Sequence, residues 1–459
     1  MNSPRSRGRN YPVRYSTNPA SRISQLTIIL PASFFHNDVP SDGQPKPHSW
    51  TSDSTDAETA FGDAKVFHWI SKQFTKSAVW CLSFHCAVAI LEKCYIGCFF
   101  GKRHDMTAPW QEYLNHVSGP LSFDKRILCL FLIHNEAHLL PDLFAHYRAM
   151  GDMQFVVVDD RSTDETPDIL AREPDVTVFA PQEGSTYAKD KRAWRGTLLD
   201  GLSEGRWCLS IDVDERLVWR GYPQRSLATL IDDMDRKGAQ ALIASMLDMY
   251  ADRPIAEHMA GPRPLGETFD HYDDPRKDPF AYSSALMPRR FREKFPLPNT
   301  MLMGGMRERL FGSYTAGPLA RWLQRDALKQ PRHLPPICLP LAALAKKLST
   351  PHGATPPMNQ TKVPLVKWRT GLRYNGGAHH LSLPLRPASE YGVLLHYPIT
   401  RGVEGINYTA TRGQHAHGSA HYHTMGTSAS LSALNPVYSG TSRLTDFSAL
   451  APFFGDPNQ

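Results

Sequence analysis

Hydrophobic and polar positions alternate regularly between residues 124 and 250, and this pattern predicts the fold class. Continuous apolar runs, typical of strands covered on both faces, occur at residues 127–133, 155–158, 176–179, 207–213 and 241–245. Between them, residues 141–150 and 189–202 carry apolar side chains at helical spacing. Strands and helices that alternate with short connections predict an α/β protein with a mostly parallel sheet flanked by helices.

The pattern fades on both sides of this region. Residues 1–60 are polar and proline-rich, which predicts a disordered segment. Residues 61–123 are expected to form a helical and apolar extension of unknown role. We place the main domain at residues 124–400 and a C-terminal extension that packs on it at residues 401–459.

One apolar stretch in the N-terminal extension raises the question of a membrane. Within residues 61–103, the uninterrupted apolar part is about fourteen residues long, whereas roughly twenty are needed to span a bilayer. Peripheral membrane contact through this segment, spanning, and packing on the main domain all remain open, with packing favoured.

Composition and charge narrow the class of protein. The chain has 41% hydrophobic and 21% charged residues, as ordinary globular proteins do. Its net charge is +6, and the basic residues are spread along the chain without forming a basic stripe, which argues against a nucleic-acid partner. The seven cysteines are an odd number without metal-site spacing, and the N-terminus does not resemble a secretory signal. We therefore expect a cytoplasmic protein without disulfides, and membrane association stays open.

Three carboxylates end the apolar run 207–213, in the stretch WCLSIDVDE. Alternation along an extended strand would place Asp212 and Asp214 on the same face. Adjacent carboxylates repel each other unless a cation joins them, and Mg²⁺ or Mn²⁺ favours oxygen ligands. Ligands of open α/β sheets bind at the carboxyl ends of the strands. A divalent-metal site is one interpretation, and a solvated strand end is the other.

A second acidic stretch, VVVDDRSTDET, follows the run 155–158. If the strands are parallel neighbours, Asp159 and Asp160 lie along the same sheet edge as Asp212. Ser162 and Thr163 can cap the helix that follows. Capping does not account for Asp159 and Asp160, which leaves them as candidates for ligand binding.

The segment LFLIHNEAHLLPDLFAHYRAMGDMQFVVVDDRSTDET, together with WCLSIDVDE, resembles the family 2 glycosyltransferases, which have the GT-A fold. The likeness is to a bacterial subgroup and continues through SMLDMY, GGMRERLF, KVPLVKW, GAHHLS, LLHYP and RGQHAHGSAHY, so it covers roughly residues 124–455. The resemblance implies an inverting hexosyltransferase. Such an enzyme moves a sugar from a nucleotide-diphosphate donor to a hydroxyl of a glycan, lipid or protein acceptor, with Mg²⁺ or Mn²⁺ as cofactor.

The resemblance also implies roles for individual residues. Contacts to the nucleotide sugar are expected from Asn135, Glu136, Asp159, Asp160, Ser162 and Asp212. Asp212 and Asp214 match the D-x-D motif that binds the metal, whereas Glu215 is expected to support them from behind. His396 is a candidate for a further metal ligand or for a hydrogen-bonded core histidine. His379 and His380 are weaker candidates.

An inverting displacement needs a general base for the acceptor hydroxyl. Asp248 in SMLDMY and Glu308 in GGMRERLF are the candidates, and we favour Asp248 because two arginines flank Glu308. Glycines beside Arg307 and Arg309 permit close backbone approach, and guanidinium groups match phosphate geometry. We expect these two arginines to contact the donor or acceptor.

Two other functions remain open. A nucleotidyltransferase-like enzyme could use a similar sheet, although its usual glycine-rich basic loop is missing from IHNEAHLL. A non-catalytic, membrane-associated binding protein could share the fold, although the acidic motifs argue against it. A basic helix face with Lys191 and Arg195 precedes D-x-D and is either solvated or directed at a diphosphate.

Overall fold

The computed structural model describes one compact unit of the chain. Two units are distinguished, Met1–Lys102 and Arg103–Gln459, and the described residues all belong to the second. They run from 108 to 455 without residues 123–124, 152, 313–318, 320–321, 324, 350–357, 415–418, 420–421, 424 and 426–432. The predictions for residues 1–107 lie outside this part. Within it, no helix combines the length and the apolar character needed to cross a bilayer.

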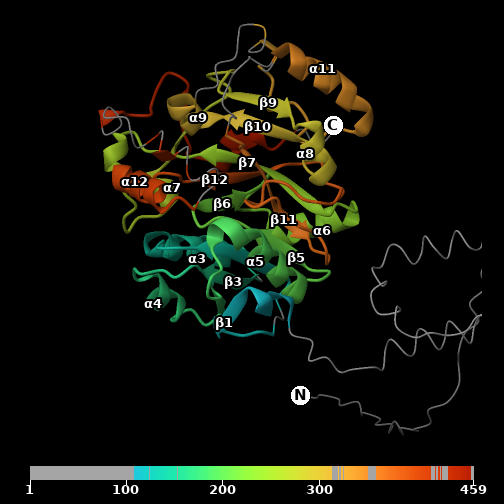
Figure 1. Cartoon of the computed structure of the whole chain (residues 1–459). Helices are drawn as coiled ribbons and strands as arrows, with labels where there is room; N and C mark the ends of the chain where they lie inside the picture. The colour runs from blue at the N-terminus through green and yellow to red at the C-terminus, as the bar shows by residue number, and fades with distance from the viewer. Residues whose placement is uncertain are drawn as a thin grey trace, which may run out of the picture. The chain divides into compact units, whose positions relative to one another are not determined.

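A nine-stranded sheet forms the centre of this unit (Figure 1). In spatial order its strands are β1 (Leu114–Ser118), β4 (Val176–Pro181), β3 (Met153–Asp159), β2 (Ile127–Ile133), β5 (Trp207–Ser210), β11 (Thr361–Lys367), β7 (Ala241–Asp248), β12 (Gly392–His396) and β6 (Glu215–Val218). Strands β1, β11 and β6 run antiparallel to their neighbours, whereas the others share one direction. The prediction of an α/β protein with a mostly parallel sheet is confirmed.

Helices cover both faces of the sheet because its strands are apolar on both faces. They are α3 (Leu140–Arg148), α4 (Thr166–Leu170), α5 (Tyr187–Leu202) and α6 (Leu227–Arg236). Along β2, Cys129 and Phe131 belong to the core cluster that includes residues of α3 and α6. Leu128 and Leu130 belong to the other cluster, with Trp194 of α5. Side chains thus alternate between two cores, as a doubly covered strand requires.

Shorter elements surround the sheet. They are η2 (Pro109–Glu112), η3 (Ala137–Leu139), η4 (Ile255–Glu257), α7 (Leu265–Thr268), β8 (His271–Asp273), β9 (Tyr282–Leu286), α8 (Arg289–Lys294), β10 (Thr300–Gly304), α9 (Gly305–Phe311), η5 (Pro336–Cys338), α11 (Leu339–Ser349), α12 (Gly402–Arg412), β13 (Thr441–Arg443) and η8 (Phe447–Phe453). Strand β10 pairs with β9, and β13 pairs with β8. We placed the start of the main domain at residue 124, and β1 adds residues 114–118 to its sheet.

Strand β5 is shorter than predicted. Its last pairing with β2 joins Ser210 to Leu130, and the chain then turns, with Glu215 N donating to Asp212 O over 3.1 Å. Asp212 and Asp214 therefore lie on a turn. The prediction that they alternate along a strand ending at residue 213 is wrong, because the chain leaves the sheet after Ser210 and turns while β2 continues to Ile133.

Candidate active site

Polar side chains from five neighbouring strands meet at one edge of the sheet. In strand order they are Asp212 and Asp214 after β5, Lys362 near the start of β11, Asp248 at the end of β7, His396 at the end of β12 and Glu215 at the start of β6. Because β11 and β6 run opposite to the others, their first residues reach the edge where the others end. The order of the strands, which is not the order of the sequence, builds this cluster.

His396 links two of the carboxylates. The sheet register places it opposite Asp248 of β7 and opposite Glu215 of β6. Its Nδ1 lies 2.9 Å from Asp248 Oδ1, and its Nε2 lies 3.2 Å from Asp214 Oδ2. Burial and the charge of Arg307 would lower the pKa of His396, but its two carboxylate partners raise it to about 9. Without a metal the ring is thus protonated and donates to carboxylates on both sides, and it would release its Nε2 proton on binding a cation.

Asp248 is buried behind His396. Its carboxylate accepts hydrogen bonds from Arg307 Nε at 3.0 Å and from Arg307 N at 3.1 Å. Burial alone would raise the pKa of Asp248, but the charge of Arg307 and the hydrogen bond to His396 hold it well below its ordinary value. A carboxylate so firmly ionised and enclosed is a poor proton acceptor, and this geometry favours a positioning role.

Lys362 brings a buried positive charge into the cluster. It is 1% exposed, forms an ion pair with Asp212, and its Nζ lies 2.5 Å from Glu215 Oε1. Arg195 Nη2 lies 3.8 Å from the other oxygen of Asp212, and Glu215 Oε2 accepts a hydrogen bond from Asp212 N. Burial would lower the pKa of Lys362, but these two carboxylates raise it. Lys362 begins the motif KVPLVKW but was not among the predicted site residues.

The donor set at this edge suits a divalent cation. Asp214, Glu215 and His396 form a group of described residues whose potential ligand atoms all lie within 4.8 Å of one another. Carboxylate oxygens with one imidazole nitrogen fit Mn²⁺ well and Mg²⁺ less well. Of the predicted ligands, Asp214 and His396 belong to this group. Asp212 and Glu215 are both paired with Lys362, and Glu215, which we expected to support the metal ligands, is itself one of the three residues whose potential ligand atoms lie together.

The predicted nucleotide-binding residues come together beside this cluster, after β2 and β3. Ser162 Oγ accepts a hydrogen bond from Asn135 N at 2.8 Å, and Ser162 N donates to Asp159 Oδ1 at 3.0 Å. The prediction that Ser162 and Thr163 cap α4 is wrong. Asp164 Oδ1 accepts from Thr166 N instead, and the cap residue Glu165 forms no side-chain cap. Ser162 serves to join the two loops.

Helix α12 packs over these loops and supplies groups from late in the chain. Arg412 Nη2 lies 2.5 Å from Asp160 Oδ2, and Asn135 Nδ2 donates to the hydroxyl of Tyr408 at 2.8 Å. Burial raises the pKa of Glu136 to about 8, and Arg401, 3.9 Å away, opposes this rise. The motif RGQHAHGSAHY begins with Arg412, but its spacing gave no indication of the partner Asp160. We call the following residues the loop corner: Asn135, Glu136, Asp159, Asp160 and Ser162 of the two loops, with Arg401, Tyr408 and Arg412.

One cavity of about 1450 Å³ connects the carboxylate cluster with the loop corner. We call it the chamber. Its polar part is lined by Glu136, Asp212, Asp214, Arg307, Lys362 and His396. Away from the sheet, the wall becomes apolar, with Leu286, Met301, Met303 and Ala342. The chamber therefore has a charged end and an apolar end.

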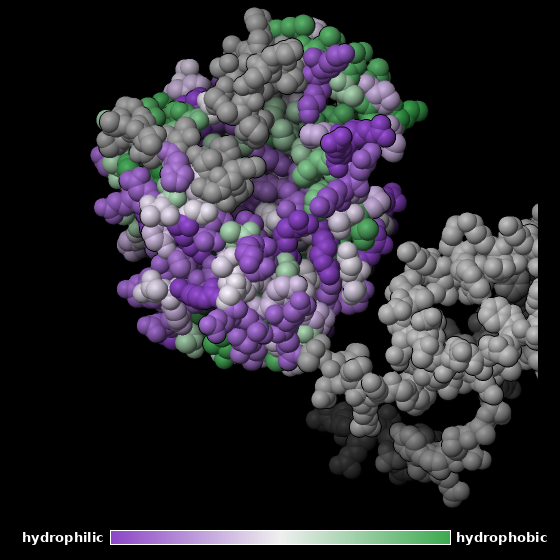
Figure 2. Space-filling view, viewed as in Figure 1, coloured by the Kyte–Doolittle hydropathy of each residue, from purple (hydrophilic) through white to green (hydrophobic). Residues whose placement is uncertain are grey.

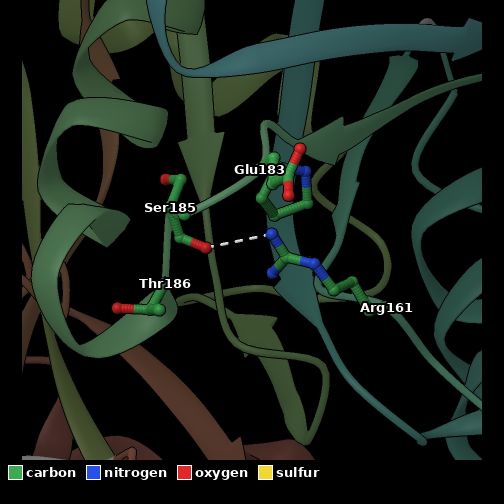
Figure 3. A pocket seen from close by; sticks show the side chains of 6 residues that line it. Arg161, Glu183, Ser185 and Thr186 are labelled. Carbon is green, nitrogen blue, oxygen red and sulfur yellow. Dashed lines mark hydrogen bonds between the residues drawn. The ribbon is translucent and has the colours of Figure 1, made fainter.

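A second, smaller cavity lies on the outer side of the loop corner. It measures about 590 Å³ and is lined by Arg161, Pro181 and residues 183–186. Figure 3 shows the Arg161 guanidinium donating to the carbonyl of Ser185, at 3.0 Å. The same guanidinium lies 2.9 Å from Asp160 Oδ1. Arg161 and Arg412 thus hold Asp160 from two sides.

Residues of the GGMRERLF motif lie in two places, the wall of the chamber and the structure around it. Arg307 and Glu308 line the chamber. Burial raises the pKa of Glu308, whose Oε2 accepts a hydrogen bond from Met358 N at 2.9 Å. Arg309 lies on Asp273, with Nε 3.0 Å from Oδ2, and its guanidinium covers the Tyr438 ring. Arg309 is not among the residues that line the chamber.

His380 behaves as a core histidine whose tautomer is fixed. Its Nδ1 donates to Pro298 O at 2.9 Å, and its Nε2 accepts from Asn359 Nδ2 at the same distance. The amide of Asn359 is oriented by Thr361 N, which donates to Asn359 Oδ1. A proton on Nε2 would meet another donor. Burial, which would deprive a charged ring of water, lowers the pKa of His380 to about 4, although the hydrogen bond to Pro298 O opposes this shift.

This environment predicts a loss of stability in mild acid. A histidine whose pKa is lower in the folded protein than its value of about 6.5 in the unfolded chain stabilises the fold fully above that pH. This contribution to the free energy of unfolding is lost as the pH falls towards 4. Between pH 7 and pH 5, wild type should lose about 2 kcal/mol more unfolding free energy than His380→Gln. Urea unfolding at both pH values measures this difference. Equal losses would show that His380 does not titrate with unfolding.

No protein-family model matches the chain, and no curated protein matches it in sequence. One similar solved structure is the mannosyltransferase PcManGT from Pyrobaculum calidifontis in complex with GDP-Man and Mn²⁺. It has 19% identity and a TM-score of 0.20, and the match covers 37% of this chain and 45% of that chain.

Another similar structure is 4-diphosphocytidyl-2C-methyl-D-erythritol synthase, with 18% identity and a TM-score of 0.19. That match covers 28% of this chain and 64% of that chain. The chain thus spans about half the length of the first structure and less than two thirds of the second.

Proposed function

We propose that this chain is a metal-dependent, inverting glycosyltransferase that moves a sugar from a nucleotide-diphosphate donor to an acceptor hydroxyl. The observation that carries the proposal is that Asp214 and His396 of the possible cation group line the same chamber as Glu136, Arg401 and Arg412 of the loop corner, with Glu215 buried beside them. A cation site beside a set of nucleotide-binding groups is the arrangement that such a donor needs. The resemblance of the sequence motifs to family 2 glycosyltransferases supports the same function.

The loop corner would hold the nucleoside. Carboxylates such as Asp159 and Asp160 accept hydrogen bonds from the N–H edge of a base or from ribose hydroxyls. Their orientation is fixed before a ligand arrives, since Asp160 lies between Arg161 and Arg412. Arg401 and Lys191 also line the chamber and add positive charge for the diphosphate.

The sheet edge would hold the cation and the diphosphate. Asp214, Glu215 and His396 would bind Mn²⁺ or Mg²⁺, which neutralises charge on a leaving diphosphate when it is bound. Asp248 and Arg307 keep the ring of His396 in place from behind. Lys362 and Arg195 balance the charge of Asp212, so that a buried acidic group can face an anionic donor.

The acceptor hydroxyl must lose a proton as it attacks the sugar from the side opposite the diphosphate. Glu308 would accept this proton as the general base, because it lines the chamber and burial raises its pKa. A raised carboxylate pKa brings the group closer to neutral pH, where a general base works best. Asp248, the base we favoured from the sequence, would act as a positioning residue.

Nucleotide binding tests the proposal directly. UDP or GDP should bind the purified chain at least about tenfold more tightly with Mn²⁺ than with EDTA, because the cation joins the diphosphate to the acidic group. Isothermal titration of UDP, GDP and CDP measures this dependence. Arg412→Ala should weaken binding of the preferred nucleotide, since Asp160 loses a fixed partner.

Two outcomes would count against the proposal. If none of the three nucleotides binds, or if binding ignores the cation, the chain is not a metal-dependent glycosyltransferase. Release of inorganic diphosphate from a nucleoside triphosphate, with no sugar transfer from a panel of nucleotide sugars, would indicate the nucleotidyltransferase alternative.

A further inference from the structure

Helix α11 exposes a row of large apolar side chains to solvent. Leu341, Leu344 and Leu348 are 73%, 55% and 60% exposed, and Ile337 of the preceding turn is 85% exposed. At about 100° per residue, the three leucines fall within roughly 60° of one another around the helix axis. They therefore form one continuous face, which we call the leucine face. Figure 2 shows this hydrophobic surface over α11, at the top right of the view.

An adjacent side of the same helix belongs to the chamber. Ala342, Ala345 and Lys346 line it, next to its apolar end. Lys346 Nζ also donates to Leu286 O of β9, at 2.6 Å, which fixes the helix on the small sheet. The leucine face therefore cannot turn inwards to be buried. An exposed apolar row on a helix held in this way marks an interaction site.

The charge around the leucine face is positive. Lys347 is exposed on α11, and Arg292 of α8 is close enough to lower the pKa of Lys346, after the larger effect of burial. Helix α8 has the sequence RRFREK, with four basic residues and one acidic residue. The sequence contains no Asp or Glu between Asp326 and Glu390. An apolar helical face beside an exposed lysine and a mainly basic helix is complementary to an anionic interface.

We propose that the leucine face docks on the surface of an anionic lipid bilayer, with α11 lying in the plane of the interface. The leucines enter the acyl boundary, and the basic side chains of α11 and α8 contact lipid phosphates. The inference goes beyond the proposed function and does not depend on it. Docking places a lipid surface at the wall that closes the apolar end of the chamber.

Vesicle sedimentation with the full chain tests this docking. The protein should bind vesicles of phosphatidylcholine with an equal amount of phosphatidylglycerol more strongly than pure phosphatidylcholine vesicles. The double variant Leu341→Gln/Leu344→Gln should reduce the partition coefficient for the anionic vesicles by about tenfold or more, because two apolar anchors are lost. Glutamine is nearly as good a helix former as leucine, so α11 should remain folded.

The matched control is Leu121→Gln/Met259→Gln, which replaces two side chains of similar exposure outside α11. It should bind anionic vesicles as the wild type does. The proposal is overturned if the wild type does not bind, or if the α11 variant binds equally well, which would assign any binding to another part of the chain. It is also overturned if the α11 substitutions convert a dimer to a monomer in solution, since a second copy would then cover the face.

Discussion

Asp214→Asn is expected to lower the rate of sugar transfer by about a thousandfold while changing the melting temperature of the metal-free protein by no more than about 3 °C. Asp214 belongs to the acidic group at the sheet edge, where a bound cation would neutralise the leaving diphosphate. Its side chain is 27% exposed, and its partner His396 keeps the hydrogen bond to Asp248. Asparagine has nearly the same volume as aspartate but no charge, so sugar transfer should slow while the fold is kept.

Asp235→Asn is the control for this experiment. Asp235 is 35% exposed and forms one ion pair, with Lys367, at the other end of the same strands. Its replacement should leave transfer unchanged. If Asp214→Asn retains activity within a factor of a few, or loses it together with the fold, the acidic group does not have the proposed role. Measurements of transfer rate and of melting temperature on both variants separate these results.

Lys362→Met should lower the free energy of unfolding by about 3 kcal/mol, because it leaves Asp212 and Glu215 together without their buried counter-charge. Mn²⁺ should then stabilise the variant more than it stabilises the wild type, since a cation at this edge restores part of the missing charge. Thermal unfolding with and without Mn²⁺ measures both effects. The variant should also transfer sugar more slowly, because its metal-free site is less well ordered.

Lys367→Met, five residues along the same strand, provides the matched control. Lys367 is 41% exposed and pairs with Asp235, and exposed pairs of this kind contribute less than about 1 kcal/mol. Its replacement should produce a small loss that Mn²⁺ does not change. If the two variants lose the same stability, or if Mn²⁺ shifts both melting temperatures equally, Lys362 is not the counter-charge of the acidic group.

The first half of the fold could be predicted because its strands are buried on both faces. Strand β2 has the predicted bounds, and β3, β4 and β7 extend the predicted runs by a few residues. A continuous apolar run between two helices leaves few alternatives. The loops after β2 and β3 begin where these strands end, so the sequence also indicated that their candidate residues lie close together.

Strand β11 could not be predicted in the same way. It contains Pro364, a residue that usually argues against a central strand because it cannot donate to the ladder. The structure accommodates it where the register with β7 shifts, between Lys362 and Leu365. Lys362 was not predicted as a site residue, because its position beside Asp212 and Glu215 depends on which strands flank β11. Long-range partners such as Arg412 and Asp160 likewise leave no trace in local periodicity.

The position of β11 has a consequence for how the chain folds. It lies between β5 and β7, but it is made of residues 361–367, far after both in the sequence. Until it arrives, a growing chain carries two strands whose inner edges have no partner, a state that invites pairing with other chains. Closing such distant contacts is slow. The two halves of the sheet can therefore join only late in synthesis, and the nascent chain is a natural client for chaperones that shield strand edges.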